Sequence, residues 1–168
     1  MRLHLDRFNA PIGEILLVHD ADGALRALDF TDYASRMHRL LRLHYGDPTL
    51  AESRAPAGTR QSLQAYFDGD LIALETIRVS TGGTAFQRAV WTALRQILPG
   101  AVTTYGELAR QIGHPTAMRA VGAANGANPI GIVVPCHRVI GASGKLTGYG
   151  GGLPRKDWLL RHENAVRR

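Results

Sequence analysis

The residues with the clearest chemical potential in this chain lie together in the segment Pro135-Cys136-His137-Arg138-Val139. Cys136 is the only cysteine among 168 residues, and an imidazole and a guanidinium follow it directly. A thiol acts as a nucleophile in its thiolate form, and neighbouring cationic or imidazole groups favour that form. Many cysteines outside disulfides are instead small buried apolar residues. The segment therefore indicates either a cysteine nucleophile or a core residue.

Two neighbouring segments should determine how the thiol is presented. The apolar run 132–134 predicts a short buried strand, and Pro135 would end its pairing. Successive side chains of an extended chain point to opposite faces, so Cys136 and His137 need not touch directly, and a bridging water molecule is reasonable. Asn128 stands before a proline, which favours a turn, and its amide can bond nearby backbone. Asn128 is therefore expected to shape the path of the chain into Cys136.

The first half of the chain has the pattern of an α+β lobe. Strands are expected over 3–8, 14–19 and 24–30, and helices over about 35–45 and 59–67. Asp22-Gly23 is a hairpin signal between two of the strands. The histidines of this half lack the close spacing of metal ligands, so no metal site is expected. Ser80-Thr81-Gly82-Gly83 indicates a linker, which predicts domains over 1–80 and 81–168.

The second half is expected to be mainly helical. Thr84 with Gln87, and Thr104 with Glu107, have the spacing of capping boxes. Helices are expected over about 84–98, 105–112 and 116–125, with a terminal helix opening near Pro154. Two short helices joined by a glycine-containing turn form a helix-turn-helix pattern. The second of them carries mostly small residues, which suits close helix packing or approach to a DNA groove.

Composition narrows the class of protein further. The formal net charge of +6 suits a polyanionic partner such as DNA. No apolar run approaches the roughly 20 residues of a membrane span, and no signal-peptide core is expected. A single cysteine excludes an internal disulfide and a multi-cysteine zinc site. A reducing, cytoplasmic setting without membrane contact is therefore expected.

Several motifs, taken together, resemble one known family. They are Arg119-Ala120-Val121-Gly122, Asn128-Pro129, the run 133–140 around Cys136, Gly148-Tyr149, Gly151-Gly152, Trp158-Leu159-Leu160 and His162-Glu163. In order and spacing these motifs are similar to those of the O6-alkylguanine-DNA alkyltransferases, in the bacterial form without an additional regulatory domain. The resemblance is strongest from 84 to 163 and continues weakly through the first half.

The resemblance implies an RNase H-like α/β lobe followed by a mainly helical lobe with a helix-turn-helix. It also implies direct reversal of DNA damage. A methyl or larger alkyl group would move from O6-alkylguanine, and from O4-alkylthymine, to Cys136 in a single turnover after nucleotide flipping. No cofactor is implied, because the protein itself accepts the alkyl group. The implied partner is double-stranded DNA, bound through its minor groove by a monomer, with cooperative binding left open.

The same resemblance assigns roles around the acceptor Cys136. His137 would act through a water molecule as the base, and Glu163 would orient and polarise His137. Asn128 would support the turn that carries the cysteine. Tyr105 would hydrogen-bond the extruded guanine and stabilise it as a leaving group.

Roles in DNA contact are implied for the small-residue helix. Arg119 would enter the duplex and fill the space of the flipped nucleotide, because its head is polar and planar. Ala120 and Gly122 would let the helix sit deep in the narrow minor groove. The pocket for the extruded base would be formed by Val139, Ala142, Tyr149 and Gly150.

Two other functions use part of the same pattern. A DNA-binding module without transfer activity would use the positive charge, the helix pair and Arg119, but it leaves Cys136 and Glu163 unexplained. A cysteine hydrolase would use Cys136, His137 and Glu163, but it requires an oxyanion site that the sequence does not indicate. The fate of the alkyl group in an assay separates the three functions.

Overall fold

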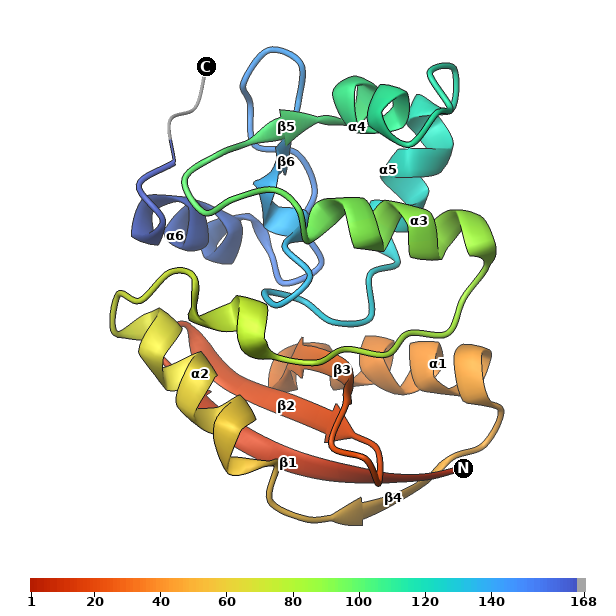
Figure 1. The fold of residues 1–168 in the computed structure, drawn as a ribbon, viewed down its shortest axis with the longest axis vertical. Helices are drawn as coiled ribbons and strands as arrows, with labels where there is room; N and C mark the ends of the chain where they lie inside the picture. Colours follow the sequence, from red (N-terminus) through yellow and green to blue (C-terminus); the bar gives the residue numbers. More distant parts are fainter. Residues whose placement is uncertain (166–168) are drawn as a thin grey trace. The chain divides into compact units, whose positions relative to one another are not determined.

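The computed structural model describes residues 1–165 and divides into two compact units. The first unit contains 1–82 together with 129–133. The second contains 83–128 and, of the described residues, 134–165. Figure 1 shows helices and strands along the chain, which confirms the α+β class. No helix among the described residues is long and apolar enough to cross a membrane.

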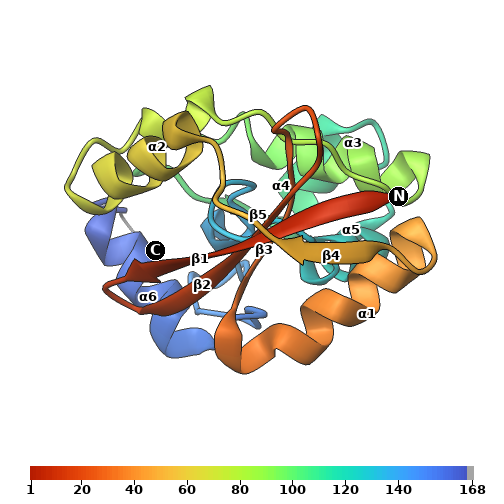
Figure 2. The same ribbon diagram turned by 90° about the horizontal axis from the view of Figure 1, so that it is seen from below.

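A four-stranded sheet forms the base of the first unit (Figure 2). Its strands are β1 (Arg2–Ala10), β2 (Gly13–His19), β3 (Leu25–Phe30) and β4 (Thr49–Glu52). Their order is β3-β2-β1-β4, with antiparallel pairs except for β4, which runs parallel to β1. The first three strands confirm the sequence prediction. The fourth was missed because it is short and lacks the alternation of a half-buried strand.

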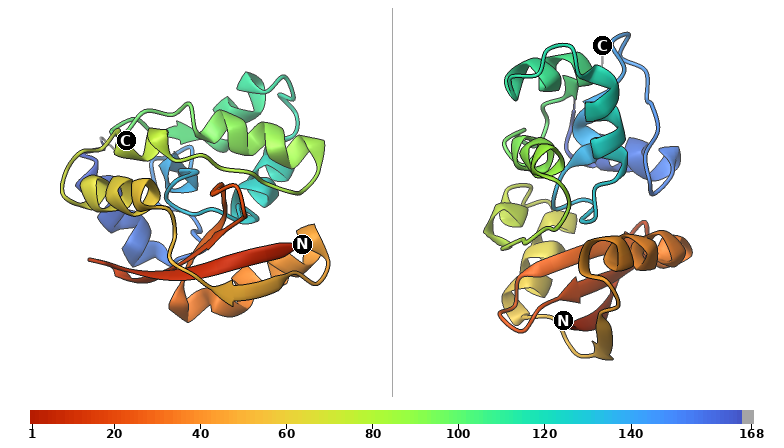
Figure 3. Two further views of the ribbon diagram at one scale, coloured as in Figure 1. Left: turned by 60° about the horizontal axis from the view of Figure 1, so that its bottom comes forward. Right: turned by 90° about the vertical axis from the view of Figure 1, so that its right-hand side faces the viewer.

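Two helices pack on this sheet, as Figure 3 shows. Helix α1 (Ala34–Tyr45) buries Met37 and Leu41 in a cluster with residues of β1, β2 and β3. Helix α2 (Ala57–Phe67) places the Phe67 ring 6.3 Å from that of Phe8. Both helices confirm the expected segments, because their apolar residues recur with helical spacing.

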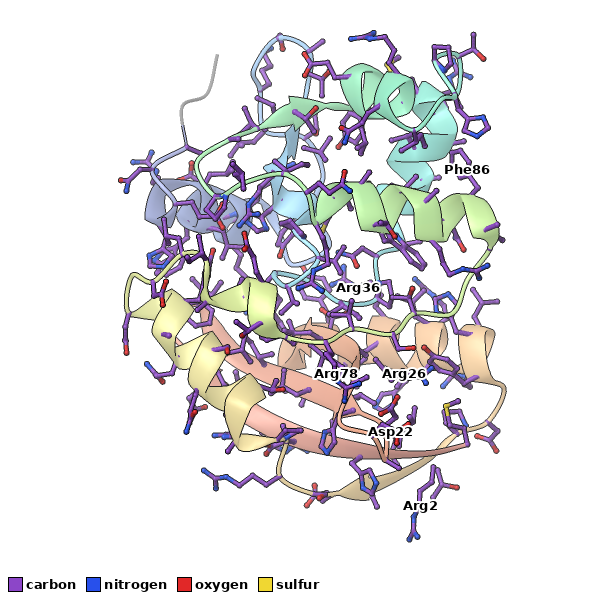
Figure 4. All side chains as sticks on the ribbon, in the orientation of Figure 1. Arg2, Asp22, Arg26, Arg36, Arg78 and Phe86 are labelled. Atoms are coloured by element: carbon purple, nitrogen blue, oxygen red, sulfur yellow. The ribbon has the colours of Figure 1, made fainter. Side chains whose placement is uncertain are left out.

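The β2–β3 hairpin is fixed by a small polar network, whose residues Asp22, Arg26 and Arg78 are labelled in Figure 4. The Asp20 carboxylate accepts from the Asp22 backbone N–H at 2.9 Å and from Arg26 Nε at 2.8 Å. The Arg78 guanidinium donates to the Asp22 carbonyl. Gly23 has φ +81°, a conformation that suits glycine. The turn predicted at Asp22-Gly23 is confirmed.

Helices dominate the second unit. They are α3 (Ala85–Leu94), α4 (Tyr105–Gln111), α5 (Met118–Gly126) and α6 (Leu153–His162), with a parallel pair of short strands, β5 (Thr103–Thr104) and β6 (Val139–Ile140). The capping box of Thr84 and Gln87 is confirmed, with both hydrogen bonds present. Thr104 Oγ1 accepts from the Glu107 N–H at the start of α4.

Two helix boundaries differ from the prediction. Helix α3 ends at Leu94 rather than near 98, because the chain enters successive turns before Pro99, a residue that disfavours helix before it. Helix α5 begins at Met118 rather than near 116, because Pro115 and Thr116 form a turn. Of the small residues of α5, Ala124 is buried and its carbonyl accepts from Trp91 Nε1 on α3 at 2.8 Å, whereas Ala120 and Ala123 are exposed.

The strand expected over 132–134 is wrong. Residues 131–133 form a turn in which the Val133 N–H donates to the Gly131 carbonyl at 2.7 Å. Ile132 has φ +68°, a conformation that is strained for a β-branched residue and is held here by complete burial. A short apolar run indicates burial but does not by itself indicate strand pairing.

Candidate active site

Cys136 opens a single 3-10 turn, Cys136–Arg138, rather than an extended segment. The expectation that Cys136 and His137 point to opposite faces of a strand is therefore wrong. The turn is anchored by the Cys136 N–H, which donates to the Val134 carbonyl at 2.8 Å, and by the Arg138 N–H, which donates to the Pro135 carbonyl. Cys136 is 7% exposed, so the residue is buried.

Glu163 joins the two residues that follow the cysteine. Its Oε2 lies 2.9 Å from His137 Nε2, and its two oxygens accept from Arg138 Nε and Nη2, each at 2.9 Å. Arg138 also donates to the Ile97 carbonyl at 2.6 Å. His137 and Glu163 are 0% and 2% exposed. Arg138 is thus a bidentate partner of Glu163, and not only the positive charge beside the thiol that its position suggested.

Burial and charge set the protonation of this cluster. Burial lowers the pKa of His137, the Glu163 carboxylate opposes this, and Arg138 and Lys156 lower it further. Burial raises the pKa of Glu163, but attraction and hydrogen bonds from His137 and Arg138 outweigh it and hold that pKa well below its usual range. Because Arg138 already neutralises Glu163, we assign His137 as neutral with its proton on Nε2. Nδ1 then carries the basic lone pair, and it is buried with no hydrogen-bond partner among the described residues.

Two asparagines hold the chain before and after the cysteine. Asn128 Nδ2 donates to the Val134 carbonyl at 2.8 Å, which ties together the two ends of the loop 129–133. Asn125 Nδ2 lies 3.5 Å from the Cys136 carbonyl. The contact of Asn128 is the one expected of a residue that shapes the path into Cys136, whereas Asn125 was not anticipated.

Lys156 is the main site residue that the sequence analysis missed. It is fully buried, and its ammonium group donates to the carbonyls of Val139 at 2.6 Å and Thr147 at 3.1 Å. Burial lowers the pKa of Lys156 to about 8, and the charge of Cys136 in its thiolate form opposes that decrease. Lys156 therefore places a positive charge where it favours the thiolate. The sequence had suggested this role for Arg138, because Arg138 lies near Cys136 in the chain.

Tyr105 and Tyr149 each contact a residue of this part of the unit. The Tyr105 hydroxyl is 2.8 Å from Thr147 Oγ1. The Tyr149 ring meets the His137 ring edge-on, with 6.5 Å between centroids. A Cβ added at Gly122 would lie 3.8 Å from the Tyr105 ring, an ordinary van der Waals distance, so this ring lies against α5 at Gly122.

Among the described residues, the remaining ones expected at the site form no hydrogen bond or ion pair with the cluster around the cysteine turn. Arg119 and Ala120 are exposed in the first turn of α5. Ala142 lines a pocket of about 360 Å³ whose lining, 100–104, Glu107, 140–142 and Gly144, excludes Cys136. Gly150 lies in the turn before α6. The roles of these residues toward DNA and the extruded base remain predictions.

Within residues 1–165, no group of three or more His, Cys, Asp or Glu side chains could hold a metal ion. The chemistry of the cluster is that of a thiol with an adjacent neutral imidazole, an ionised carboxylate and a buried ammonium group. Groups of these kinds can favour a thiolate and receive its proton.

Known proteins are similar to this chain in sequence and in fold. Residues 85–165 match the model of the 6-O-methylguanine DNA methyltransferase DNA-binding domain. A methylated-DNA–protein-cysteine methyltransferase of Salmonella typhimurium is 52% identical over 97% of this chain and 96% of its own. One from Methanosarcina acetivorans is 43% identical over 94% and 96%.

Solved structures show that the similarity includes the fold. The crystal structure of Mycobacterium tuberculosis OGT in complex with DNA has a TM-score of 0.79 and 44% identity, and it covers 98% of this chain and 93% of that one. Identity at this level over nearly the whole length also shows common descent, so this chain belongs to the family of the methylated-DNA–protein-cysteine methyltransferases.

Proposed function

We propose that this protein repairs DNA by direct reversal, taking the alkyl group of O6-alkylguanine onto Cys136 in a single turnover. The observation that carries the proposal is the buried cluster of His137, Glu163 and Arg138 that follows the only cysteine of the chain. The names of the relatives support the same reaction, because the acceptor they specify is a protein cysteine. O4-alkylthymine is a second substrate inferred from the same chemistry.

In the transfer step, the Cys136 thiol loses its proton to His137 Nδ1, through a water molecule that joins the two. Glu163 holds the imidazole through Nε2 and stabilises the positive charge that the ring acquires. The thiolate sulfur forms a bond to the alkyl carbon while the bond from that carbon to guanine O6 breaks. The electron pair leaves with guanine, and the Tyr105 hydroxyl stabilises the anion by hydrogen bonding. The product is a thioether, which explains why one molecule acts once.

DNA is the proposed macromolecular partner, bound as a monomer through the minor groove. Helices α4 and α5 would act as the helix-turn-helix, with Ala120 and Gly122 allowing close approach and Arg119 replacing the flipped nucleotide. Val139, Tyr149, Gly150 and Ala142 would border the extruded base. A relative bound to DNA and the positive charge of the chain support this partner.

We also infer domains over 1–80 and 81–168, with an RNase H-like first lobe. The strand order β3-β2-β1-β4, three antiparallel strands followed by a parallel one, supports that assignment. A cytoplasmic location fits a DNA partner and a reactive thiol.

A label on the alkyl group tests the proposed function. The protein is incubated with a duplex that carries O6-methylguanine labelled in the methyl group, and the label is followed. Transfer to protein up to one equivalent supports direct reversal. Lesion binding with the label retained on DNA would support a binding module instead, and release of labelled methanol over many turnovers would support a hydrolase.

Arg119→Ala tests nucleotide extrusion. We expect saturated transfer from duplex DNA to slow by on the order of tenfold, because unstacking a base costs a few kcal/mol that Arg119 would offset. Reaction with the free base O6-benzylguanine needs no extrusion and should change little. The two rates are measured by single-turnover kinetics at saturating duplex and with the free base.

Arg110→Ala is the matched control, since Arg110 is also an exposed arginine of this helix pair. It should weaken DNA affinity in a salt-dependent manner without slowing saturated transfer. Equal losses on duplex and free base in Arg119→Ala would show that Arg119 has a structural role instead. A loss confined to affinity would show that it contacts a phosphate.

A further inference from the structure

The hydroxyl of Tyr105 has a partner within the protein. Tyr105 is the first residue of α4, and its ring lies against Gly122 of α5. Its Oη is 2.8 Å from Oγ1 of Thr147, which belongs to the loop between β6 and α6. Either oxygen can be the donor in this contact. The phenol proposed to stabilise the leaving guanine is thus already joined to a second hydroxyl.

Thr147 is held in this position by contacts other than its hydroxyl. Lys156 Nζ donates to the Thr147 carbonyl at 3.1 Å and to the Val139 carbonyl at 2.6 Å, which ties the loop to the chain just after the cysteine turn. A Cβ at Gly141 would lie 3.1 Å from Thr147 Cγ2, so the loop closes tightly around the threonine. The main chain and methyl group therefore fix the residue, and the hydroxyl is left to interact with Tyr105.

The chemistry of the two hydroxyls sets the direction of this hydrogen bond. Each hydroxyl has one donor and two acceptor sites. Without a substrate, the more acidic phenol is the better donor, so Tyr105 donates to Thr147. When guanine offers an acceptor to Tyr105, the Thr147 hydroxyl can rotate and donate to Tyr105 Oη. Hydrogen bonds in such a chain polarise and strengthen one another.

We propose that Thr147 is a positioning residue for alkyl transfer, whose hydroxyl donates to Tyr105 while Tyr105 donates to the departing guanine. The proposal rests on the proposed function, since it requires guanine to leave beside Tyr105. No covalent bond changes between the two side chains, and no proton passes from one oxygen to the other. The effect is to make the phenol a stronger donor as negative charge develops on guanine.

Thr147→Val removes the hydroxyl and keeps the shape of the side chain. We expect single-turnover transfer from O6-benzylguanine, and from duplex O6-methylguanine at saturation, to slow by about fivefold, the effect of one hydrogen bond between neutral groups. Thr147→Ser keeps the hydroxyl and should stay within about twofold of the unsubstituted protein. In a Tyr105→Phe background, Thr147→Val should cause no further loss, because the hydroxyl then has no phenol to polarise.

A leaving-group series separates positioning from a structural effect. O6-benzylguanine with an electron-withdrawing substituent at C8 forms a more stable anion, so the loss caused by Thr147→Val should shrink with this substrate. A structural defect would slow both substrates equally and would also lower the thermal unfolding midpoint. Equal slowing, unchanged rates or faster transfer in Thr147→Val would each overturn the proposal, and faster transfer would show that Thr147 competes with guanine for Tyr105. If the unsubstituted protein itself accepts no alkyl group, the proposed function fails, which is a separate result.

Discussion

Cys136→Ser is expected to abolish alkyl transfer while leaving binding to O6-methylguanine DNA intact. The chain has no other cysteine, and a serine hydroxyl near neutral pH is a far weaker nucleophile than a thiolate. Loss of a nucleophile from a catalytic relay lowers rates by on the order of a thousandfold or more. The change is small in volume at a residue that is 7% exposed, so the fold should be retained.

Two measurements check this expectation. Intact-mass analysis after incubation with the alkylated duplex should show no added alkyl group on Cys136→Ser. Fluorescence anisotropy with the same duplex should give a Kd close to that of the unsubstituted protein. If the serine variant gains an alkyl group at the normal rate, another side chain is the acceptor and the proposed reaction is wrong.

Glu163→Gln is expected to have the next largest effect, slowing transfer by on the order of a hundredfold. The amide cannot hold His137 Nε2–H and both arginine nitrogens as the carboxylate does at 2.9 Å. It also leaves the Arg138 charge buried without its counter-ion, which typically costs about 3 kcal/mol or more. The structure therefore adds a loss of stability to an exchange that, on shape alone, should be tolerated.

The pH dependence of Glu163→Gln identifies the cause of the slower transfer. Burial lowers the pKa of His137 and Glu163 opposes it, so loss of the negative charge lowers that pKa further. A weaker base takes the thiol proton less readily. Because the imidazolium that receives the thiol proton is then less stable, the Cys136 thiolate forms only at higher pH, and the pH at which the transfer rate reaches half its maximum should shift upward.

Asp157→Asn on α6, the helix that ends just before Glu163, is the control for Glu163→Gln. It removes an ion pair with Arg161, whose side chain is 72% exposed, and should change neither the pH profile nor, by more than about 1 kcal/mol, the stability in urea. A pH profile of Glu163→Gln that coincides with the unsubstituted one would show that Glu163 does not act through His137.

The features that depend on local sequence patterns could be predicted from the sequence. The capping box of Thr84 and Gln87, the hairpin at Asp22-Gly23 and the apolar stripes of α1 and α2 depend on neighbours only a few positions away. The partnership of His137 with Glu163 could be anticipated only through the family resemblance, because 26 positions separate the two residues. A pairing of this kind carries no local pattern.

Two features of the site were not predicted from the sequence. The apolar run before Cys136 predicts a strand, but Ile132 adopts a left-handed conformation and the run forms a turn. A run of branched residues does not indicate that conformation. The sequence does contain a pattern that indicates burial of Lys156. Lys156 stands three and four positions before Leu159 and Leu160 and seven before Glu163, so both charged residues continue the buried stripe of α6. A lysine on such a stripe needs partners, and the structure supplies them as the carbonyls of Val139 and Thr147.

Peptide mapping after one round of reaction tests the central claim most directly. The protein is mixed with excess duplex containing O6-methylguanine, digested with trypsin and analysed by tandem mass spectrometry. Cleavage after Arg119 and Arg138 places Cys136 in the peptide 120–138. The account predicts one methyl group per molecule, located on Cys136, with an equal amount of unmodified guanine restored in the DNA. Restored guanine with an unmodified Cys136 peptide, or methylation at any other residue, would contradict it.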